Sequence, residues 1–186
     1  MSRFRIVDTP IAGLKIVERS RQSDQRGFLA RLFCAEELAP AGWSKPIAQI
    51  NQTLTRRPGA VRGMHFQFPP HAEMKLVNCI RGEVWDVAVD LRRGSPTFLK
   101  WFGARLSAQN GQALLIPEGF AHGFQALMED CELIYFHTCA YHAASEGALH
   151  PEEPRVAIQW PQAVAELSTR DRGHPMLSPA FQGILA

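Results

Sequence analysis

A histidine flanked by apolar neighbours is the first candidate for chemistry in this chain. In the stretch Arg62-Gly63-Met64-His65-Phe66-Gln67, an extended conformation places Met64 and Phe66 on one face and His65 on the other. An imidazole that points away from apolar neighbours needs a polar partner, which can be a substrate, a metal or another side chain. A lone histidine of this kind is more often structural. The nearby Arg62 and a second histidine motif downstream favour a functional site.

Asp171 is a carboxylate whose role the local sequence leaves open. It ends the stretch Ser168-Thr169-Arg170-Asp171, which has the spacing of a helix capping box with Asp in place of Glu. In one interpretation Asp171 stabilises the start of a helix, and in the other it orients an imidazole. The spacing by itself favours the cap.

The segments that must position these residues are short and strand-like. Three of them alternate between apolar and polar side chains, as half-buried strands do: residues 47–54, 85–91 and 131–139. Turn signals separate the β runs between residues 59 and 141, and no helical pattern of 15 residues interrupts them. Strands without crossover helices predict an antiparallel sandwich or barrel. The polar face with Gln49 and Asn51 faces solvent on an open sheet but can line a cavity in a barrel.

Local signals also predict the helices, one turn and one irregularity. One helical turn is expected over Ala35–Leu38 and a short helix over residues 162–167. Asn110-Gly111 is typical of a β-hairpin turn. Arg62 and His65 are three positions apart, so a regular strand would place their side chains on opposite faces. A ligand shared by both requires a bulge, which we expect at Gly63.

The composition is that of a globular domain. The chain has 186 residues, of which 46% are apolar and 20% charged, and we expect a single domain over residues 1–186. A net charge of +2 with scattered Lys and Arg lacks the electrostatic footprint of a nucleic-acid-binding protein. No apolar stretch approaches the ~20 residues that span a membrane, and no signal-peptide pattern occurs, so we expect a cytoplasmic protein. The four cysteines lack CxxC spacing and are expected to be reduced thiols.

The second histidine motif resembles a known superfamily. The spacing of Gly111, Pro117, Gly119 and His122 is similar to the second motif of the cupins, which are small β-barrels also called jelly rolls. Metal-binding cupins carry His-x-His in the first motif, where this chain has His65-Phe66-Gln67. An amide is a poor ligand for a borderline metal ion, so we expect the barrel without a metal site.

A larger set of motifs narrows the resemblance to one family. In order and over roughly residues 5–178, they are similar to the dTDP-4-dehydrorhamnose 3,5-epimerase family: residues 62–67, 75–77, 81–92, 94–98, 116–124 and 158–161. The resemblance implies a cupin-type antiparallel β-barrel, a jelly roll with a few short helices that are mostly C-terminal. It also implies that residues 1–34 form N-terminal strands at a dimer interface and that residues 161–186 form a short helix and a tail.

The family epimerises the carbons that flank the ketone of a nucleotide-linked 4-keto-6-deoxy sugar, in deoxysugar and polysaccharide biosynthesis. The resemblance implies conversion of the type dTDP-4-dehydro-6-deoxyglucose to dTDP-4-dehydrorhamnose, without a metal or organic cofactor. Abstraction of a proton next to a carbonyl needs a base with a pKa near neutrality, which suits histidine. The developing enolate needs a cation or hydrogen-bond donor, and proton return needs an acid on the far face of the ring.

The resemblance assigns these roles to residues of this chain. His65 matches the base, Asp171 the carboxylate that orients it, Tyr135 the acid and Lys75 the cation near the keto oxygen. Here the resemblance overrides the capping interpretation of Asp171, although one residue can serve both purposes. The expected substrate-binding residues are Arg26, Phe28, Arg31, Gln49, Asn51, Arg62, His122, Tyr141, Glu146 and Arg170. The segment that contains Arg26 crosses to the neighbouring subunit in this family, so the resemblance implies a homodimer.

Several positions depart from the family pattern. Arg31 stands where Glu is common, Leu99 replaces a glycine, and Ile50, Phe136 and His142-Ala143 also differ. None of these is the expected base, carboxylate or acid. We therefore expect retained proton chemistry with an altered nucleotide or sugar specificity, and the nucleobase and the inverted carbons stay open.

Two other functions remain as alternatives. One is a metal-dependent cupin oxygenase or isomerase that uses His65 and His122 as ligands. The other is a protein that binds a sugar nucleotide without catalysis.

Overall fold

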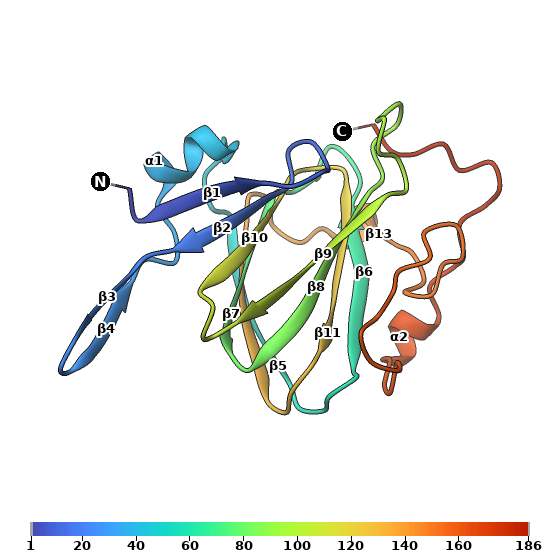
Figure 1. Cartoon of the computed structure of the whole chain (residues 1–186). Coiled ribbons are helices and arrows are strands. Elements are labelled where there is room, and N and C mark those ends of the chain that lie inside the picture. Colours follow the sequence, from blue (N-terminus) through green and yellow to red (C-terminus); the bar gives the residue numbers. More distant parts are fainter. Residues whose placement is uncertain (1, 186) are drawn as a thin grey trace.

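The alternating segments form strands that pair into two facing antiparallel sheets (Figure 1). The computed structural model describes residues 2–185. The larger sheet has six strands in the order β1-β2-β10-β7-β12-β5. These strands are β1 (Phe4–Asp8), β2 (Lys15–Arg19), β5 (Gln49–Thr55), β7 (Lys75–Arg81), β10 (Gln112–Ile116) and β12 (Cys131–His137).

The smaller sheet has five strands in the order β13-β6-β11-β8-β9. These strands are β6 (Val61–Gln67), β8 (Glu83–Asp90), β9 (Trp101–Ser107), β11 (Phe120–Ala126) and β13 (Glu146–Ala148). All strand pairings within the two sheets are antiparallel. Neighbouring strands come from distant parts of the chain, as β6 beside β11 shows. The architecture is a cupin-like jelly roll, which confirms the predicted all-β class.

Apolar side chains from both sheets fill much of the space between them. Val77 and Leu133 of the larger sheet are buried together with Leu106 and Phe124 of the smaller one. Successive side chains of a strand point to opposite faces, so every second residue of each strand contributes to this interior. Removal of this surface from water stabilises the barrel. Polar side chains of the same strands line the remaining interior space.

The outer face of the larger sheet is covered by an N-terminal layer. Helix α1 (Ala35–Leu38) and the 3-10 helix η1 (Ala39–Ala41) lead into Trp43, which is buried in the same cluster as Leu76 and Phe136 of the sheet. Helix α1 confirms the helical turn predicted for these residues.

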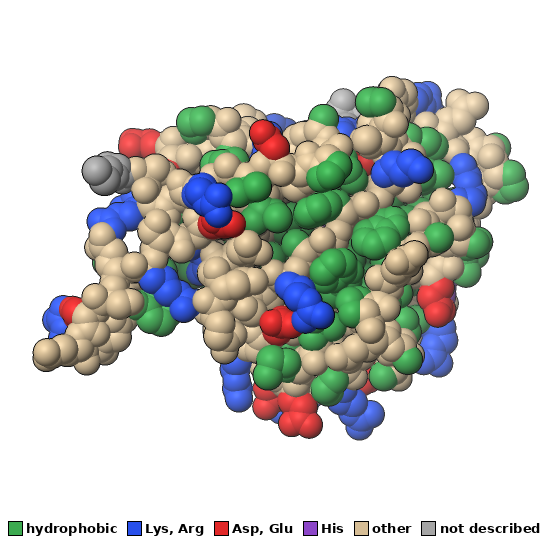
Figure 2. Space-filling model, in the orientation of Figure 1, with side chains coloured by type: hydrophobic (Ala, Val, Ile, Leu, Met, Phe, Trp, Pro, Cys, Tyr) green, Lys and Arg blue, Asp and Glu red, His purple; other side chains and the backbone are tan. Residues whose placement is uncertain are grey.

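The outer face of the smaller sheet is covered by the C-terminal segment, drawn in orange to red in Figure 1. Leu149 and Ile184 of this segment are buried against Val87 and Val89 of β8. Figure 2 shows hydrophobic side chains gathered in the middle of this face. Strand β8 is therefore covered on both sides, by the barrel interior and by the C-terminal segment.

A separate hairpin projects from the barrel (Figure 1). Its strands, β3 (Arg21–Asp24) and β4 (Gly27–Ala30), pair only with each other among the described residues 2–185. The large apolar side chains of Phe28 and Leu29 are 61% and 72% exposed. Exposed apolar side chains gathered on one projecting element are typical of an interaction surface.

The predicted helix over residues 162–167 is wrong. This segment runs alongside the start of β6, where the N–H of Ala165 donates to the carbonyl of Gly59 (3.0 Å) and the carbonyl of Glu166 accepts from Val61 (2.9 Å). Pairing with a neighbouring strand outweighs a weak local helix preference. The helix forms just after it, as α2 (Thr169–Arg172).

The expected hairpin at Asn110-Gly111 is also wrong. The turn joins β9 to β10, and these strands lie in different sheets. The side-chain oxygen of Asn110 accepts from the backbone N–H groups of Ser107 (3.1 Å) and Gln112 (2.9 Å), which stabilises the turn. A local signal that bends the chain therefore does not decide which strands pair.

Two further expectations concern the whole chain. All four cysteines are free thiols. No helix within residues 2–185 combines the length and apolar character needed to cross a bilayer.

Candidate active site

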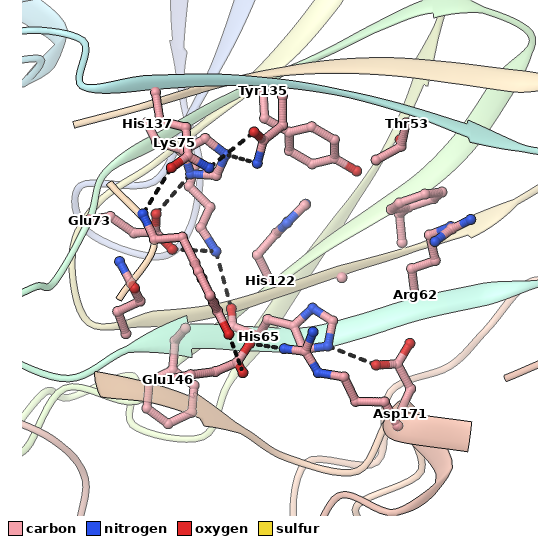
Figure 3. Close-up of a pocket in the computed structure, with 18 of the residues that line it drawn as sticks. Thr53, Arg62, His65, Glu73, Lys75, His122, Tyr135, His137, Glu146 and Asp171 are labelled. Atoms are coloured by element: carbon pink, nitrogen blue, oxygen red, sulfur yellow. Dashed lines mark hydrogen bonds and ion pairs between the residues drawn. The ribbon is translucent and has the colours of Figure 1, made fainter. Parts of the chain in front are cut away.

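A polar cavity of about 380 Å³ opens between the two sheets (Figure 3). Strands β5, β7 and β12 of the larger sheet form one wall, and β6 and β11 of the smaller sheet form the other. The cavity brings together most of the site residues expected from the sequence, namely His65, Asp171, Tyr135, Lys75, Gln49, Asn51, Arg62, His122, Tyr141, Glu146 and Arg170. The polar face of β5 therefore lines the cavity, although Asn51 on this face is also exposed to solvent.

His65 and Asp171 form a histidine–carboxylate dyad. The Nε2 atom of His65 lies 2.8 Å from Oδ1 of Asp171. Although burial alone raises the pKa of Asp171, the contact with His65 and the N–H of Gly63 lower it below its ordinary value. The carboxylate is therefore ionised and can only accept, so Nε2 carries the proton. The Nδ1 lone pair of His65 is left as the basic site.

The structure shows how Asp171 is related to the helix cap. Ser168 is the N-cap of α2, and its hydroxyl accepts a hydrogen bond from the backbone N–H of Asp171 (3.0 Å). The side chain of Asp171 points instead to His65, and its Oδ2 atom accepts from the N–H of Gly63 (3.4 Å). The cap fixes the backbone of Asp171 and leaves its carboxylate for the imidazole.

Strand β6 is irregular at Gly63, as predicted. His122 of β11 pairs with His65, whereas Phe124 pairs with Arg62, so β6 contains one extra residue. Gly63 has a φ of 133°, and a Cβ atom added there would lie 2.5 Å from Cα of Gly123. The bulge lets Arg62 and His65 both line the cavity.

Tyr135 faces the dyad from the other sheet. It lies on β12, whereas His65 lies on β6, and Figure 3 shows the two side chains at opposite walls. Burial raises the pKa of Tyr135 above its ordinary value. The phenol therefore keeps its proton across the neutral range and suits the role of an acid.

His122 is held by a buried carboxylate that the sequence interpretation missed. Its Nε2 atom lies 2.8 Å from Oδ1 of Asp86 on β8, and its ring meets Tyr135 edge-on at 5.8 Å. Burial raises the pKa of Asp86. His122 is thus fixed beside the proposed acid.

Lys75 lies in the cavity wall within a group of three ionisable side chains. Its Nζ atom contacts Oε1 of Glu73 (3.1 Å) and donates to the carbonyl of His65 (3.2 Å). The other oxygen of Glu73 contacts Nδ1 of His137 (2.8 Å). The sequence interpretation identified Lys75 but neither Glu73 nor His137.

Two further polar contacts lie at the cavity, one made by Arg62 and the other by Arg170. Arg62 donates from Nε to the hydroxyl of Thr55 (2.9 Å). Arg170 forms an ion pair with Glu146, and the Tyr141 hydroxyl donates to the same carboxylate (3.1 Å). Arg170 comes from the α2 turn and Glu146 from β13, so this group joins segments that are distant in sequence.

Three expected substrate-binding residues lie away from this cavity in the single chain. Arg26 is paired with Asp24 at the tip of the β3–β4 hairpin, and Phe28 is stacked under Arg21 at 4.5 Å. Arg31 forms an ion pair with Glu37. Among the described residues 2–185, none of the three lines the cavity.

Most of the departures from the family pattern also lie outside the cavity. Ile50 points out from β5 and is exposed, and Phe136 stacks on Phe33 in the outer layer. Leu99 has a φ of 62°, a backbone conformation that favours the glycine expected there. His142 lies in the loop after β12 and stacks on His71 with ring centroids 3.8 Å apart.

The metal-dependent cupin alternative would use His65 and His122 as ligands, and the structure groups the possible ligands differently. His122 is bonded to Asp86, and Gln67 uses its amide to hold the carbonyls of His71 (3.0 Å) and Ala140 (3.2 Å). Within residues 2–185, the group with ligand atoms close enough for one ion is His65, Asp171 and His174, and its ligand atoms lie within 4.8 Å of one another. The pair His65 and His122 does not form such a group.

Some of the missed residues had a usable signal in the sequence. His137 shares a strand face with Tyr135, and Glu73 is two positions from Lys75 in an extended segment. His174 follows Asp171 by three positions, which brings both to the same side of a helical turn. Asp86 gave no signal, because its partner His122 is 36 positions away.

The chain is similar to known proteins along most of its length. The chain matches the family model described as dTDP-4-dehydrorhamnose 3,5-epimerase over residues 8–179. It is 40% identical over 180 residues to the dTDP-4-dehydrorhamnose 3,5-epimerase of Salmonella typhimurium, covering 95% of this chain and 97% of that protein. It is 37% identical over 178 residues to a dTDP-4-dehydrorhamnose 3-epimerase of Streptomyces niveus, covering 95% and 86%.

A solved structure shows the same fold. It is the Legionella pneumophila dTDP-6-deoxy-D-glucose-3,5-epimerase in complex with dTDP-4-keto-L-rhamnose, which has a TM-score of 0.88 at 39% identity and covers 93% of this chain and 92% of its own. The extent of these matches, together with the dyad and the phenol in one cavity, shows that the chain belongs to the dTDP-4-dehydrorhamnose 3,5-epimerase family.

Proposed function

We propose that the protein inverts C3, C5 or both carbons of a nucleotide-linked 4-keto-6-deoxy sugar. The observation that carries this proposal is a base and an acid on opposite walls of one cavity. His65, oriented by Asp171, comes from one sheet, and Tyr135 comes from the other. Epimerisation needs such a pair, because the proton must leave one face of the sugar ring and return to the other.

The residues account for each proton in the reaction. Nδ1 of His65 takes the proton from the carbon next to the ketone, and the electrons of the C–H bond move into the carbonyl to form an enolate. The Lys75 ammonium donates a hydrogen bond to the enolate oxygen and stabilises its negative charge. The Tyr135 hydroxyl then gives a proton to the opposite face of the carbon. Exchange with water returns the imidazolium and the phenolate to their starting states.

The nucleotide diphosphate is expected to bind near Arg62 and Arg170, which both line the cavity. Guanidinium groups bind phosphate oxygens through paired hydrogen bonds. Relatives that act on or bind dTDP sugars support this part of the proposal.

The proposed enzyme works as a homodimer in which the β3–β4 hairpin packs on a second copy of the chain. Phe28 and Leu29 expose apolar surface, and β5 is an edge strand whose exposed residues include Ile50. In this assembly Arg26, Phe28 and Arg31 reach toward the site of the neighbour.

Solvent exchange tests the reaction. In deuterated water, a nucleotide 4-keto-6-deoxyhexose should gain deuterium at C3, C5 or both, and His65→Ala should lower that rate on the order of 10²–10⁴-fold. Parallel assays with dTDP, UDP, GDP and CDP sugars identify the carrier. Lack of exchange with all four would exclude this function.

Light scattering tests the assembly. The wild type should have twice the mass of one chain, and Phe28→Ser with Leu29→Ser should shift it toward the monomer. Met128→Ser is the matched control, because Met128 is also exposed but lies outside the hairpin. If the wild type is monomeric and still catalyses the exchange, the dimer proposal is wrong and the proposed reaction stands.

A further inference from the structure

Three ionisable side chains form a buried group beside the proposed base and acid. Lys75, Glu73 and His137 have side chains that are 7%, 10% and 11% exposed, and all three line the cavity (Figure 3). Lys75 and His137 are direct partners across β7 and β12. The proposed reaction uses Lys75 at the enolate oxygen but gives no role to Glu73 or His137.

Glu73 is the acceptor at the centre of this group. Its Oε1 atom contacts the Lys75 ammonium and its Oε2 atom contacts His137. Although burial alone raises the pKa of Glu73, the charge of Lys75 and the bond from His137 lower it to about 2. The carboxylate is therefore negative throughout the working range and can keep a buried ammonium charged.

The hydrogen bonds of Lys75 also fix its direction. An ammonium has three N–H donors. One meets Glu73, and a second meets the carbonyl of His65 at 3.2 Å. The third donor remains for a ligand in the cavity that Lys75 lines.

His137 holds the carboxylate in place. Because Glu73 is ionised and only accepts, the contact at 2.8 Å requires a proton on Nδ1 of His137. The other ring nitrogen lies 3.5 Å from the Asn51 amide nitrogen, whose oxygen already accepts from Gln49. The imidazole thus connects Glu73 to the polar face of β5.

We infer that Glu73 and His137 are positioning residues of the epimerase site: His137 fixes the Glu73 carboxylate, which keeps Lys75 charged and directed at the keto oxygen. The inference rests on the proposed function and deepens it, because it names the residues that maintain the cation at the enolate. A bare lysine in this buried position would lose its proton more easily, because burial disfavours the charged form.

Other ionisable groups face Lys75 from the elements packed against it. His65 on β6 contributes its carbonyl, His122 on β11 is bonded to Asp86 on β8, and Tyr135 lies on β12 with its phenol protonated. The charge of Lys75 also acts on Asp86, whose Oδ1 atom contacts His122, but Glu73 is the carboxylate in direct contact with Lys75.

The first test follows the protonation of Lys75 without any substrate. The sequence has four lysines, so the ¹³Cε resonance of Lys75 can be assigned and titrated by NMR. Loss of an opposite charge at this distance should move its deprotonation about 1–3 pH units lower in Glu73→Gln than in the wild type. Glu132→Gln is the matched control, because Glu132 pairs with Arg81 at the surface of β12 outside the cavity.

The second test uses the pH dependence of epimerisation. In Glu73→Gln, the basic limb of the kcat profile should move lower with Lys75, which reduces kcat about tenfold per pH unit above the new midpoint. KM should change less than kcat, because the cation acts mainly on the enolate.

Variants of His137 separate positioning from general stability. His137→Asn keeps a donor near the Nδ1 position and should retain the wild-type profile. His137→Phe keeps the size without the donor and should shift the profile toward that of Glu73→Gln. Thermal unfolding of each variant confirms that it is folded, and His137→Asn and His137→Phe still decide the question if Glu73→Gln does not fold.

Two outcomes are distinguishable. If Lys75 titrates alike in the wild type, Glu73→Gln and Glu132→Gln, the inference is overturned, whatever the activity. If the wild type exchanges no proton with any sugar nucleotide, the proposed function fails, and the NMR titration still decides whether Glu73 and His137 maintain the charge of Lys75.

Discussion

The Nε2 atom of His65 contacts the carboxylate of Asp171 at 2.8 Å, although 106 positions separate the two residues. His65 is held in β6, next to the bulge at Gly63, and Asp171 is held in α2 by the Ser168 cap. Two independent local structures therefore set the direction of one hydrogen bond. Its effect is to leave Nδ1 of His65 free to act as the proposed base.

Replacing Asp171 by Asn should separate the charge of this residue from its place in the helix. The amide keeps the backbone N–H that Ser168 caps, but it removes the carboxylate that holds the proton on Nε2. We expect exchange to fall on the order of 10²–10⁴-fold, as when a base loses its orienting carboxylate. Ser168→Ala should instead lower the free energy of unfolding by about 1 kcal/mol. Equal exchange rates in Asp171→Asn and the wild type would remove the dyad from the mechanism.

Replacing Tyr135 by Phe should separate proton removal from proton return. The phenol is the proposed acid, and its raised pKa keeps it protonated at neutral pH. Without it, His65 can still abstract and return a proton on its own face. We expect deuterium incorporation with retained configuration and a loss of the epimerised product, measured by NMR. Epimerisation at the wild-type rate would contradict the assignment.

Replacing Gly63 by Ala should damage the site through the backbone. A Cβ atom at Gly63 would lie 2.5 Å from Cα of Gly123, so one strand must move. Gly94→Ala is the matched control, because Gly94 also has a positive φ but no atom lies within 4 Å of a Cβ added there. We expect Gly63→Ala to cost more than the roughly 1–3 kcal/mol of the backbone conformation alone, and to lower activity. Urea unfolding of both variants measures the difference.

Stability at acid pH should depend on Glu73. Its folded pKa of about 2 lies below the ordinary value of 4.5, so the ionised group stabilises the folded state fully above pH 4.5. This contribution is lost as the pH falls toward 2. Between pH 6 and pH 3, the wild type should lose about 2 kcal/mol more unfolding free energy than Glu73→Gln. Parallel urea titrations test this, and equal pH dependence would show that Glu73 is not stabilised by its partners.

Zn²⁺ should inhibit the enzyme by coordinating His65, the proposed base. His65, Asp171 and His174 offer three ligand atoms within 4.8 Å, and imidazole and carboxylate suit Zn²⁺. We expect reversible inhibition that EDTA relieves. His174→Leu should weaken the inhibition about tenfold or more, because it removes one of the three ligands. Inhibition of equal strength in this variant would place the ion elsewhere.

The sequence predicted much of the barrel and of the site. Alternation along residues 47–54, 85–91 and 131–139 predicted β5, β8 and β12 because a strand has a period of two. Parity also required the bulge at Gly63, since Arg62 and His65 had to reach one cavity. The predictions that failed concern pairing, because residues 162–167 and the Asn110-Gly111 turn take their structure from strands elsewhere in the chain.

The sequence by itself determined the residue types: a histidine, a phenol, a lysine and a carboxylate in motifs that resemble one family. Only the tertiary structure decided their relations. It placed His65 and Tyr135 on facing sheets and joined Lys75 and His137 through Glu73. Among residues 2–185, it also left the strands β3 and β4 paired only with each other. The physical reason is that periodicity fixes which face of a strand a side chain occupies. Which strand lies opposite is set by burial of apolar surface across the whole barrel.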